Sequence, residues 1–432
     1  MKMCTFSNLE KRVLDAIDAA AQEIIGLAHD VLRTPELGYF EEKTSARICR
    51  AFEELGLTYR KGLAVTGVRA DGPEKDGPRL CLIGELDAVL CPGHPDADPK
   101  TGAAHACGHH AQLAALLGAA AGLVKSGVLE ELSGRVSFFA VPAEEYIDLG
   151  HRRKLKEQGV IRYFGGKQEL IANGEFDNVD MAMMVHAHPK TPEPVVFVHG
   201  SSLGFFEKSI TFHGKAAHAS TPDLGVNALN AAALAILGMH ANRERFRDED
   251  KIRVHPIITK GGDVVNSVPS EVCMETYVRG VSFEAIRHAS VDTDRAIHGA
   301  AAMVGAEATV QTRVGYFPLH QDPVMGQVFS EAAAHFMKPE QIHSGVDMVG
   351  STDIGDLSHL MPCIQPTVGG FEGTLHGEDF CAANPDSAYL LPAKLMALTA
   401  VRLLENNAEL ARKTIAQFQP VMTKEEYLKQ FD

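Results

Sequence analysis

Residues 79–89 read RLCLIGELDAV, an apolar run that ends in two acidic residues, Glu85 and Asp87. A short apolar run bounded by polar residues is typical of a buried strand. The pattern recurs in RVSFFAVPAEE (135–145), which ends in two glutamates, and in VDMAMMVHAHP (179–189), which ends in histidines. We therefore expect three buried strands that carry ligand-type side chains at their C-terminal ends.

Segments with helical spacing separate these strands. Residues 8–32 alternate apolar and charged groups and predict one long amphipathic helix, and further helices are expected at about 41–55, 111–125, 325–337 and 387–405. Strands that alternate with helices indicate an α/β fold, in which ligands bind beyond the carboxyl ends of the strands. The sequence thus predicts a mixed-sheet α/β/α domain with its site at those ends.

The pattern changes between residues 198 and 314. There the expected order is strand, helix, strand, strand, helix, strand, which is the ferredoxin-like α+β arrangement. We interpret this segment as an inserted domain. The main domain is then discontinuous and consists of residues 1–197 and 315–432.

Composition excludes several classes of protein. The 432 residues suggest two or three domains at about 100–200 residues each. A formal charge of −15 argues against a nucleic-acid partner, because binding phosphates requires surplus Lys and Arg. The N-terminus resembles no secretory signal, and the absence of a run of about 18 apolar residues predicts no membrane span. The eight cysteines are scattered, which favours reduced thiols and a cytoplasmic location.

The segment AHACGHHAQ (104–112) concentrates metal-binding atoms at the start of an apolar helix. Cys107 and His109 lie two residues apart on a tight turn that contains Gly108, so both side chains could face one point. A thiolate, an imidazole and nearby carboxylates suit zinc, and manganese or cobalt are also feasible. The alternative is a buried cysteine beside surface histidines.

Other segments add candidates of the same chemical kind. Of Glu144 and Glu145, one could bind a metal while the other takes a proton from water, although an ordinary acidic strand end is the alternative. His186 and His188 could face one side of their strand, and only one of them need be a ligand. Asp87 could bind a metal or orient a ligating histidine. Because one α/β fold would gather these strand ends, their joint occurrence favours metal-assisted hydrolysis.

The inserted domain carries polar candidates as well. HGKAAHAS contains His213 and His218, and Asn266 in NSVPSE could donate a hydrogen bond to an oxyanion. Arg279 could pair with a substrate carboxylate. Each of these residues has a purely structural alternative.

Taken together, the segments resemble a known family. The ordered motifs are PELG, GELDAV, HACGHH, VPAEE, VHAHP, HGKAAHAS, NSVPSEV, YVRG, STDIGD and GTLHGEDF. They are similar to the amidohydrolase branch of the metallopeptidases that include aminoacylase, carboxypeptidase G and the indole-acetyl-amino-acid hydrolases. STDIGD and LHG most resemble the aminobenzoyl-glutamate hydrolase subunits. The motifs span nearly the whole chain and are specific for the family but not for a substrate.

The resemblance implies a catalytic domain with two divalent ions (Mn, Zn or Co) per subunit and an inserted lid that forms a homodimer. It implies that Glu144 is the general base and that Asp87 supports the site. It places His218 in the partner subunit's active site, where it would steady the oxyanion, and Asn266 and Arg279 at the substrate's carboxylate end or at the oxyanion. The residues that match metal ligands are Cys107, His109, Glu145, His186 and His376.

Four departures from the family pattern affect metal preference and pocket shape. His110 stands where relatives usually have Asp or Asn, and Glu85 where they often have Asp. The loop before the cysteine carries an extra histidine, His94. VHAHP holds a second histidine, His188, so the choice of His186 rests on alignment alone.

The resulting hypothesis is a metal-dependent amidohydrolase acting on a small N-acyl or N-aroyl amino acid. A dipeptidase or carboxypeptidase with the same residues is the close alternative. A non-catalytic binding protein on the same fold, or an unrelated enzyme with a single structural zinc, are alternatives of other classes.

Overall fold

The computed structural model describes residues 6–431, which divide into two compact units. The first unit comprises the described residues up to Ser201 together with His320–Asp347 and Asp356–Lys424. The second comprises Ser202–Leu319, Met348–Gly355 and the described residues from Glu425 onward. This division by contacts differs from the expected insert, 198–314, at both ends and adds two short later segments to the second unit.

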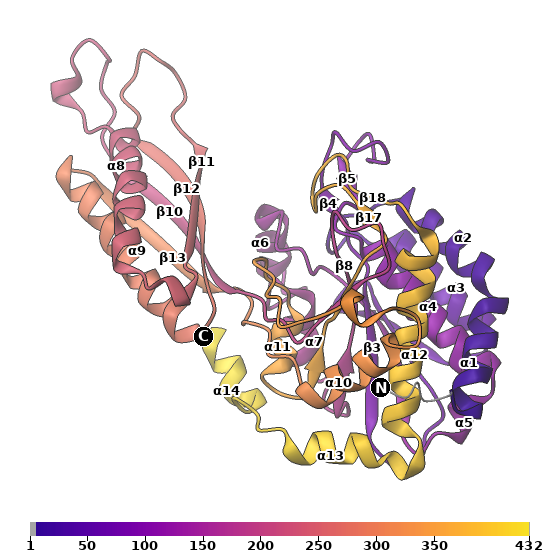
Figure 1. The fold of residues 1–432 in the computed structure, drawn as a ribbon. Coiled ribbons are helices and arrows are strands. Elements are labelled where there is room, and N and C mark those ends of the chain that lie inside the picture. Colours follow the sequence, from indigo (N-terminus) through magenta and orange to yellow (C-terminus); the bar gives the residue numbers. More distant parts are fainter. Residues whose placement is uncertain (1–5, 432) are drawn as a thin grey trace. The chain divides into compact units, whose positions relative to one another are not determined.

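A mixed six-stranded sheet forms the centre of the first unit (Figure 1). Strands β6, β3, β7 and β15 run parallel to one another, and β2 and β1 join antiparallel at the edge next to β6. The mixed α/β class predicted from the sequence is confirmed. In order across the sheet, the strands are β1 (Tyr59–Leu63), β2 (Gly67–Asp71), β6 (Arg135–Val141), β3 (Arg79–Glu85), β7 (Met181–Met183) and β15 (Cys363–Ile364).

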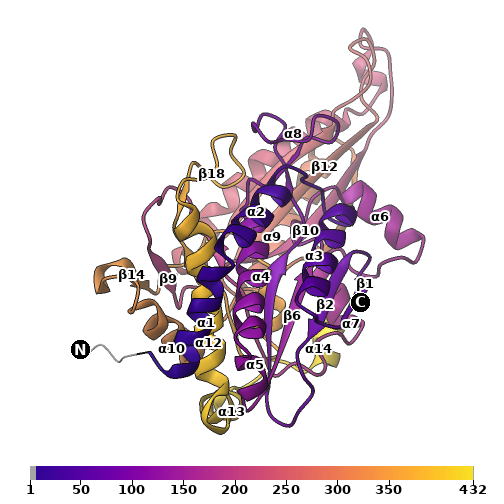
Figure 2. The ribbon, with the colours of Figure 1, turned by 90° about the vertical axis from the view of Figure 1, so that its right-hand side faces the viewer.

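Helix α4 (His109–Lys125) packs on β3 and β6 and is buried over almost its whole length. Its alanine-rich sequence is apolar on all sides, as expected of a helix enclosed by other elements. Helices α1, α2 and α12 cover it, and Figure 2 shows these elements in front of the sheet. The other helices of this unit and of the junctions are α3 (Glu42–Glu54), α5 (Val128–Glu131), α6 (Leu149–Glu157), α7 (Gly166–Ala172), α10 (Pro323–Ala333), α11 (Ile354–Ser358), α13 (Glu409–Gln417) and α14 (Lys424–Leu428).

The predicted single helix over residues 8–32 is wrong. The structure has α1 (Asn8–Ala19) and α2 (Ala21–Leu32), separated at Ala20. The amide of Ala20 bonds to the carbonyls of both Ala16 and Ile17, which tightens the last turn and lets the chain change direction. Alanine is a strong helix former, so the sequence contains no signal for this break.

Helix α12 (Leu391–Leu404) is extended at its start by a short π-helix, Asp386–Leu390. Among the described residues, this stretch, Asp386–Leu404, is the one helix long and apolar enough to cross a membrane. In the fold, 89% of the tested window is buried against the rest of the protein, so its apolar residues belong to the core.

A second sheet of four short strands lies in the same unit, with the order β14-β9-β16-β8. Its existence corrects the predicted strand 179–189, which divides into β7 in the large sheet and β8 in the small one. His186 therefore lies on a strand of the small sheet and not on the large one. The strands are β14 (Ile342–Ser344), β9 (Val196–Val198), β16 (Thr367–Val368) and β8 (His186–Ala187), with two small ribbons, β4 (Val89–Leu90) with β5 (Ala103–Ala104) and β17 (Phe371–Glu372) with β18 (Cys381–Ala382).

The second unit contains the predicted order of strand, helix, strand, strand, helix, strand. Its sheet is fully antiparallel with the order β11-β12-β10-β13, which is the ferredoxin-like topology, so this part of the fold prediction is confirmed. Alternate residues of β10 and β12, such as Phe212 and Val272, are buried with α8 and α9 in one core. The elements are β10 (Gly204–His213), α8 (Ala228–Ala241), β11 (Arg253–Lys260), β12 (Glu271–Gly280), α9 (Phe283–Met303) and β13 (Glu307–Val314).

Candidate metal centre

Parallel pairing brings the ends of β3 and β6 together in the first unit. Glu85, the last residue of β3, lies opposite Val141, the last residue of β6. The chain beyond each strand therefore emerges at the same edge. There the backbone amide of Glu145 donates a hydrogen bond of 2.9 Å to Asp87 Oδ2, which fixes the second glutamate relative to the aspartate.

The start of α4 approaches the same edge. Gly108 has φ +88°, and a Cβ at this position would lie 2.7 Å from the Cβ of Ala187, so only glycine allows the turn this close to β8. The turn places Cys107 Sγ 3.4 Å from His186 Nε2.

His376 joins from a loop far along the chain. Its amide donates a 2.8 Å hydrogen bond to the carbonyl of Ala106, which ties the loop to the cysteine segment. Its own backbone is left-handed, with φ +63°. In this position His376 Nε2 lies 3.1 Å from Glu145 Oε1.

The five residues expected as metal ligands thus fall into two triplets that share one sulfur. The donor atoms of Cys107, His109 and His186 lie within 4.8 Å of one another, and so do those of Cys107, Glu145 and His376. Thiolate, imidazole and carboxylate donors of this kind suit zinc and related divalent ions. Asp87 and Glu144 lie beside these ligands, Asp87 through the hydrogen bond to Glu145 and Glu144 with Oε2 4.0 Å from His109 Nε2.

Hydrogen bonds fix which nitrogen of each histidine can bind a metal. His109 Nδ1 bonds to the carbonyl of Asp87 at 2.9 Å, and His186 Nδ1 to the carbonyl of Ala187 at 2.9 Å. A carbonyl oxygen only accepts, so both Nδ1 atoms carry a proton, and in the neutral form of each ring Nε2 is the atom that can bind a metal. His109 Nε2 is buried without a hydrogen bond, as a ligand atom reserved for a cation would be.

Electrostatics favours the metal-binding form of the two acidic ligands, Cys107 and Glu145. Burial raises the pKa of Cys107, but the neighbouring His109 and His186 outweigh it and bring the pKa down to about 6. Burial also opposes ionisation of Glu145, yet the hydrogen bond from His376 lowers the pKa of Glu145 to about 2. Both groups are therefore anionic at neutral pH, which is the form that binds a metal.

A third triplet contains a residue that the sequence reasoning noted only as a departure. The donor atoms of Glu85, His109 and Glu144 lie within 4.8 Å of one another. Glu85 is fully buried and accepts hydrogen bonds from Lys167 Nζ at 2.7 Å and Gln112 Nε2 at 2.8 Å. The acidic position in GELDAV was the signal for Glu85, whereas nothing in the sequence pointed to Lys167 or Gln112.

Three neighbouring histidines lie outside the triplets. His188 bonds to Thr367 Oγ1 at 3.0 Å and stacks on Phe197. His110 is buried with Nε2 3.4 Å from the hydroxyl of Tyr389, and His94 bonds to the carbonyl of Phe380. The structure therefore brings His186, and not His188, to the cysteine.

The remaining predicted site residues belong to the second unit. His218 and Asn266 lie on adjacent segments, joined by a bridge between His218 and Ser267, and both are exposed. His218 Nδ1 accepts a hydrogen bond from the amide of Ser220 at 3.1 Å, so its proton is on Nε2. Arg279 lies near the other end of β12, where Nη1 bonds to Ser351 Oγ at 3.0 Å.

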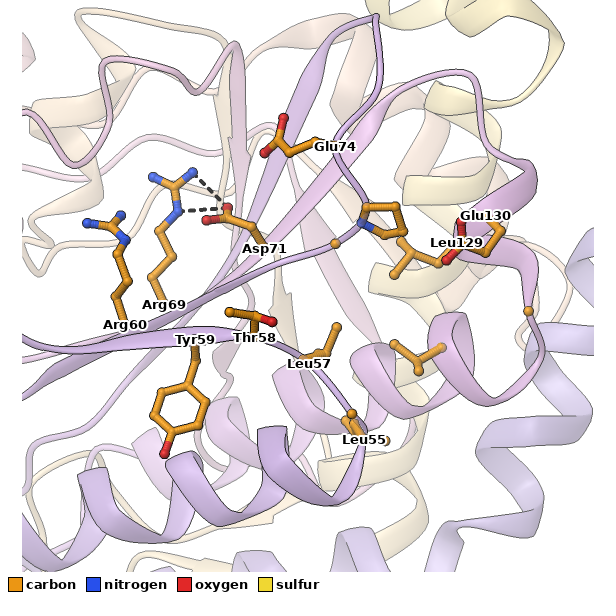
Figure 3. A pocket seen from close by; sticks show the side chains of 15 residues that line it. Leu55, Leu57, Thr58, Tyr59, Arg60, Arg69, Asp71, Glu74, Leu129 and Glu130 are labelled. Carbon is orange, nitrogen blue, oxygen red and sulfur yellow. Dashed lines mark hydrogen bonds and ion pairs between the residues drawn. The ribbon is translucent and has the colours of Figure 1, made fainter.

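Figure 3 shows a different pocket of the first unit, with a volume of about 540 Å³. No predicted site residue lines it. Its cations are already paired, Arg60 with Glu175 at 2.6 Å and Arg69 with Asp71 at 2.8 Å, and Figure 3 marks the second pair. This pocket is therefore not the candidate centre.

Thiolate, imidazole and carboxylate donors gathered beside the carboxyl ends of β3 and β6, with a further glutamate next to them, define the class of protein as a metal-dependent hydrolase. The chain matches the family model of a peptidase dimerisation domain over residues 202–298. It is 29% identical to Xaa-Arg dipeptidase of Mus musculus, over 92% of this chain and 89% of that protein.

Further comparisons agree. N-acetyl-L-cysteine deacetylase of Bacillus subtilis is 26% identical over 90% of each protein. The solved structure of a dinuclear metal-binding peptidase of the M20 family, also from Bacillus subtilis, has a TM-score of 0.68 at 24% identity and covers 90% of this chain and 99% of that one. The chain thus matches a peptidase dimerisation domain over residues 202–298 and is similar in fold to a peptidase of the M20 family.

Proposed function

We propose that the protein hydrolyses the amide bond of a small N-acyl or N-aroyl amino acid with two divalent ions per subunit. The observation that most supports this proposal is that two triplets of donor atoms share Cys107 and that Glu144 lies next to them. Cys107, common to both sets, would let two ions be held side by side, one with His109 and His186 and the other with Glu145 and His376. Manganese, zinc and cobalt all suit these donors.

When bound, the ions lower the pKa of a water molecule and polarise the amide carbonyl. Glu144 accepts the proton of the attacking water and delivers it to the leaving amine, because its carboxylate is next to the ligands without belonging to either triplet that contains Cys107. Asp87 holds the amide of Glu145 and the side chain of His109, and so keeps two ligands in place.

Residues of the second unit act on the substrate. Arg279 binds the carboxylate of the amino acid, and His218 donates a hydrogen bond from its Nε2–H group to the developing oxyanion with Asn266 beside it. His218 and Asn266 lie near the start of β12 and Arg279 near its end, roughly 25 Å away at ~3.3 Å per residue. This separation supports a homodimer in which His218 and Asn266 serve the partner subunit's centre.

A dipeptidase is the second candidate. The matched relative Xaa-Arg dipeptidase favours it, since the chain covers 89% of that protein. A carboxypeptidase would use the same residues, because these reactions differ only on the acyl side of the cleaved bond. A cytoplasmic location is part of the proposal and is supported by the cysteines of the described residues, which are all free thiols.

Hydrolysis of a substrate panel tests the proposal. N-acetyl amino acids, aminobenzoyl-glutamate and dipeptides are incubated with the protein and added manganese, zinc or cobalt, and metal is counted by elemental analysis. We expect two ions per chain and turnover of acylated amino acids. One tightly held ion without turnover would indicate a structural zinc, and turnover of dipeptides alone would favour the second candidate.

A further inference from the structure

The two glutamates of the candidate centre stand on a turn with unusual backbone geometry. Ala143, which directly precedes them, has φ +53°, a left-handed conformation that residues with a Cβ rarely adopt. Such a conformation persists only when the surroundings hold it. The turn therefore needs support from outside its own sequence.

Two buried charged side chains that the proposed mechanism does not use contact this turn. Glu41 is 0% exposed, and its Oε1 accepts a 2.8 Å hydrogen bond from the amide of Ala143. Its Oε2 accepts a 2.7 Å hydrogen bond from Thr66 Oγ1, which fixes the carboxyl group from the other side. Arg152 of α6 is 1% exposed and donates to the carbonyls of Ala143 and Glu145.

The segment that leads to Glu41 is the PELG motif, which the proposed mechanism leaves without a role. Gly38 lies so close to the turn that a Cβ there would be 2.7 Å from Arg152 Nη2 and 3.0 Å from Ala143 Cα. Two residues before Gly38, the carbonyl of Glu36 accepts a 2.8 Å hydrogen bond from the amide of Ala88, the residue after Asp87. This N-terminal segment thus contacts both strand-end turns that carry the site.

We propose that Glu41 is a positioning residue that holds the Ala143 turn, with Arg152, so that Glu145 points at the metal and Glu144 at the water. The inference rests on the proposed function. The role depends on the length of the Glu41 side chain, because its carboxyl group must be close enough to accept the hydrogen bond from the amide of Ala143. Its charge is not required for that bond.

Three variants of the protein distinguish the effect of side-chain length at Glu41 from the effect of its ability to carry a charge. Glu41→Gln keeps the acceptor for Ala143 and removes the charge. Glu41→Asp keeps the carboxyl group and withdraws the acceptor by one methylene. Glu42→Gln is the matched control, because Glu42 is the next residue and is exposed.

Cobalt(II) affinity and the visible spectrum of the cobalt protein are measured together with kcat and KM. We expect Glu41→Asp to bind cobalt about 10–100-fold more weakly, with a shifted ligand-field band, and to lose kcat by a similar factor while KM stays within about threefold. Glu41→Gln and Glu42→Gln should stay within about twofold of wild type. A wild-type spectrum for Glu41→Asp, or a Glu41→Gln defect as large as that of Glu41→Asp, would overturn the proposal.

If Glu41→Asp does not fold, Arg152→Lys provides the test instead. Lysine cannot donate to both of the carbonyls that the guanidinium group contacts. This variant should shift the cobalt band in the same way, and an unchanged band would overturn the positioning role. A wild-type protein that binds cobalt but hydrolyses no acylated amino acid would refute the proposed substrate alone, because the cobalt measurements still decide the role of Glu41. A wild-type protein that binds no cobalt would refute both.

Discussion

In the first unit most side chains of the candidate centre, though not the exposed His376, are buried or partly buried and held by other groups, whereas in the second unit His218 and Asn266 are exposed. His109 is fully buried, and Asp87 accepts a hydrogen bond from its Nδ1. His218 is exposed, and its hydrogen-bond partner Ser220 is two residues away. Donors of the first kind are positioned before any ligand arrives. Groups of the second kind become effective only when another surface covers them and excludes water.

The largest expected effect on kcat comes from the buried residue Glu144 of the first unit. Glu144→Gln should lower kcat by about 10²–10⁴-fold and leave metal content unchanged, because general acid–base catalysis contributes this much. Glu145→Gln is the matched variant, since the same change one residue later should lose metal as well. Kinetics and elemental analysis of both variants provide the test. Near-normal turnover by Glu144→Gln would remove the assigned base.

The next largest effect on kcat is expected at the exposed residue His218 of the second unit. His218→Ala should lower kcat by about 10²–10³-fold, the usual loss when one oxyanion donor is removed. His255→Ala, an exposed histidine of the same unit, should change little.

Mixing the two inactive variants sharpens the comparison between units. If His218 serves the partner subunit, heterodimers of Glu144→Gln and His218→Ala contain one intact centre and should recover up to about a quarter of the activity. Heterodimers that form, as seen by mass spectrometry, but stay inactive would place His218 in its own subunit's site.

A smaller effect is expected at Arg279. Arg279→Ala should raise KM by about 10–150-fold, the range for a lost charged hydrogen bond, with a minor change in kcat. The defect should vanish for substrates whose carboxylate is amidated. An equal defect for both substrate forms would mean that Arg279 supports its unit through Ser351, Phe205 and Tyr277 instead.

The smallest effect is a pH dependence of stability. Burial and the nearby Asp87 raise the pKa of Glu41 from 4.5 to about 8. Between these values the folded chain keeps a proton that the unfolded chain has released, so this group's contribution to stability falls as the pH rises. Urea unfolding of the metal-free protein from pH 5 to 8 should show wild type losing stability relative to Glu41→Gln. Parallel pH profiles would contradict the raised pKa.

The sequence predicted the gathering of polar residues at strand ends, because parallel strands have a common direction and their apolar runs are easily recognised. It also predicted the topology of the second unit, where alternation and turns are regular. His376 was different, since its loop has no periodic pattern and only the family resemblance indicated its role.

The unpredicted features depend on contacts between distant residues. The break at Ala20 and the division of residues 179–189 between two sheets result from packing, and the local sequence contains no signal for either. The ionisable residues Lys167, Glu41 and Arg152 would be expected at the surface from sequence alone, because such side chains are rarely buried unless they have partners.

The first unit is assembled from three stretches of chain, with most of the second unit between the first stretch and the others. During synthesis, His376 follows His186 by about 190 residues, which takes roughly 10–40 s at ~5–20 residues per second. Strand β15, the neighbour of β7, also emerges in this late part. A nascent chain therefore exposes an open sheet edge and an incomplete set of metal ligands throughout this interval, although all four strands of the ferredoxin-like sheet have been synthesised before it ends. Protection of that edge by a chaperone is most needed in this window.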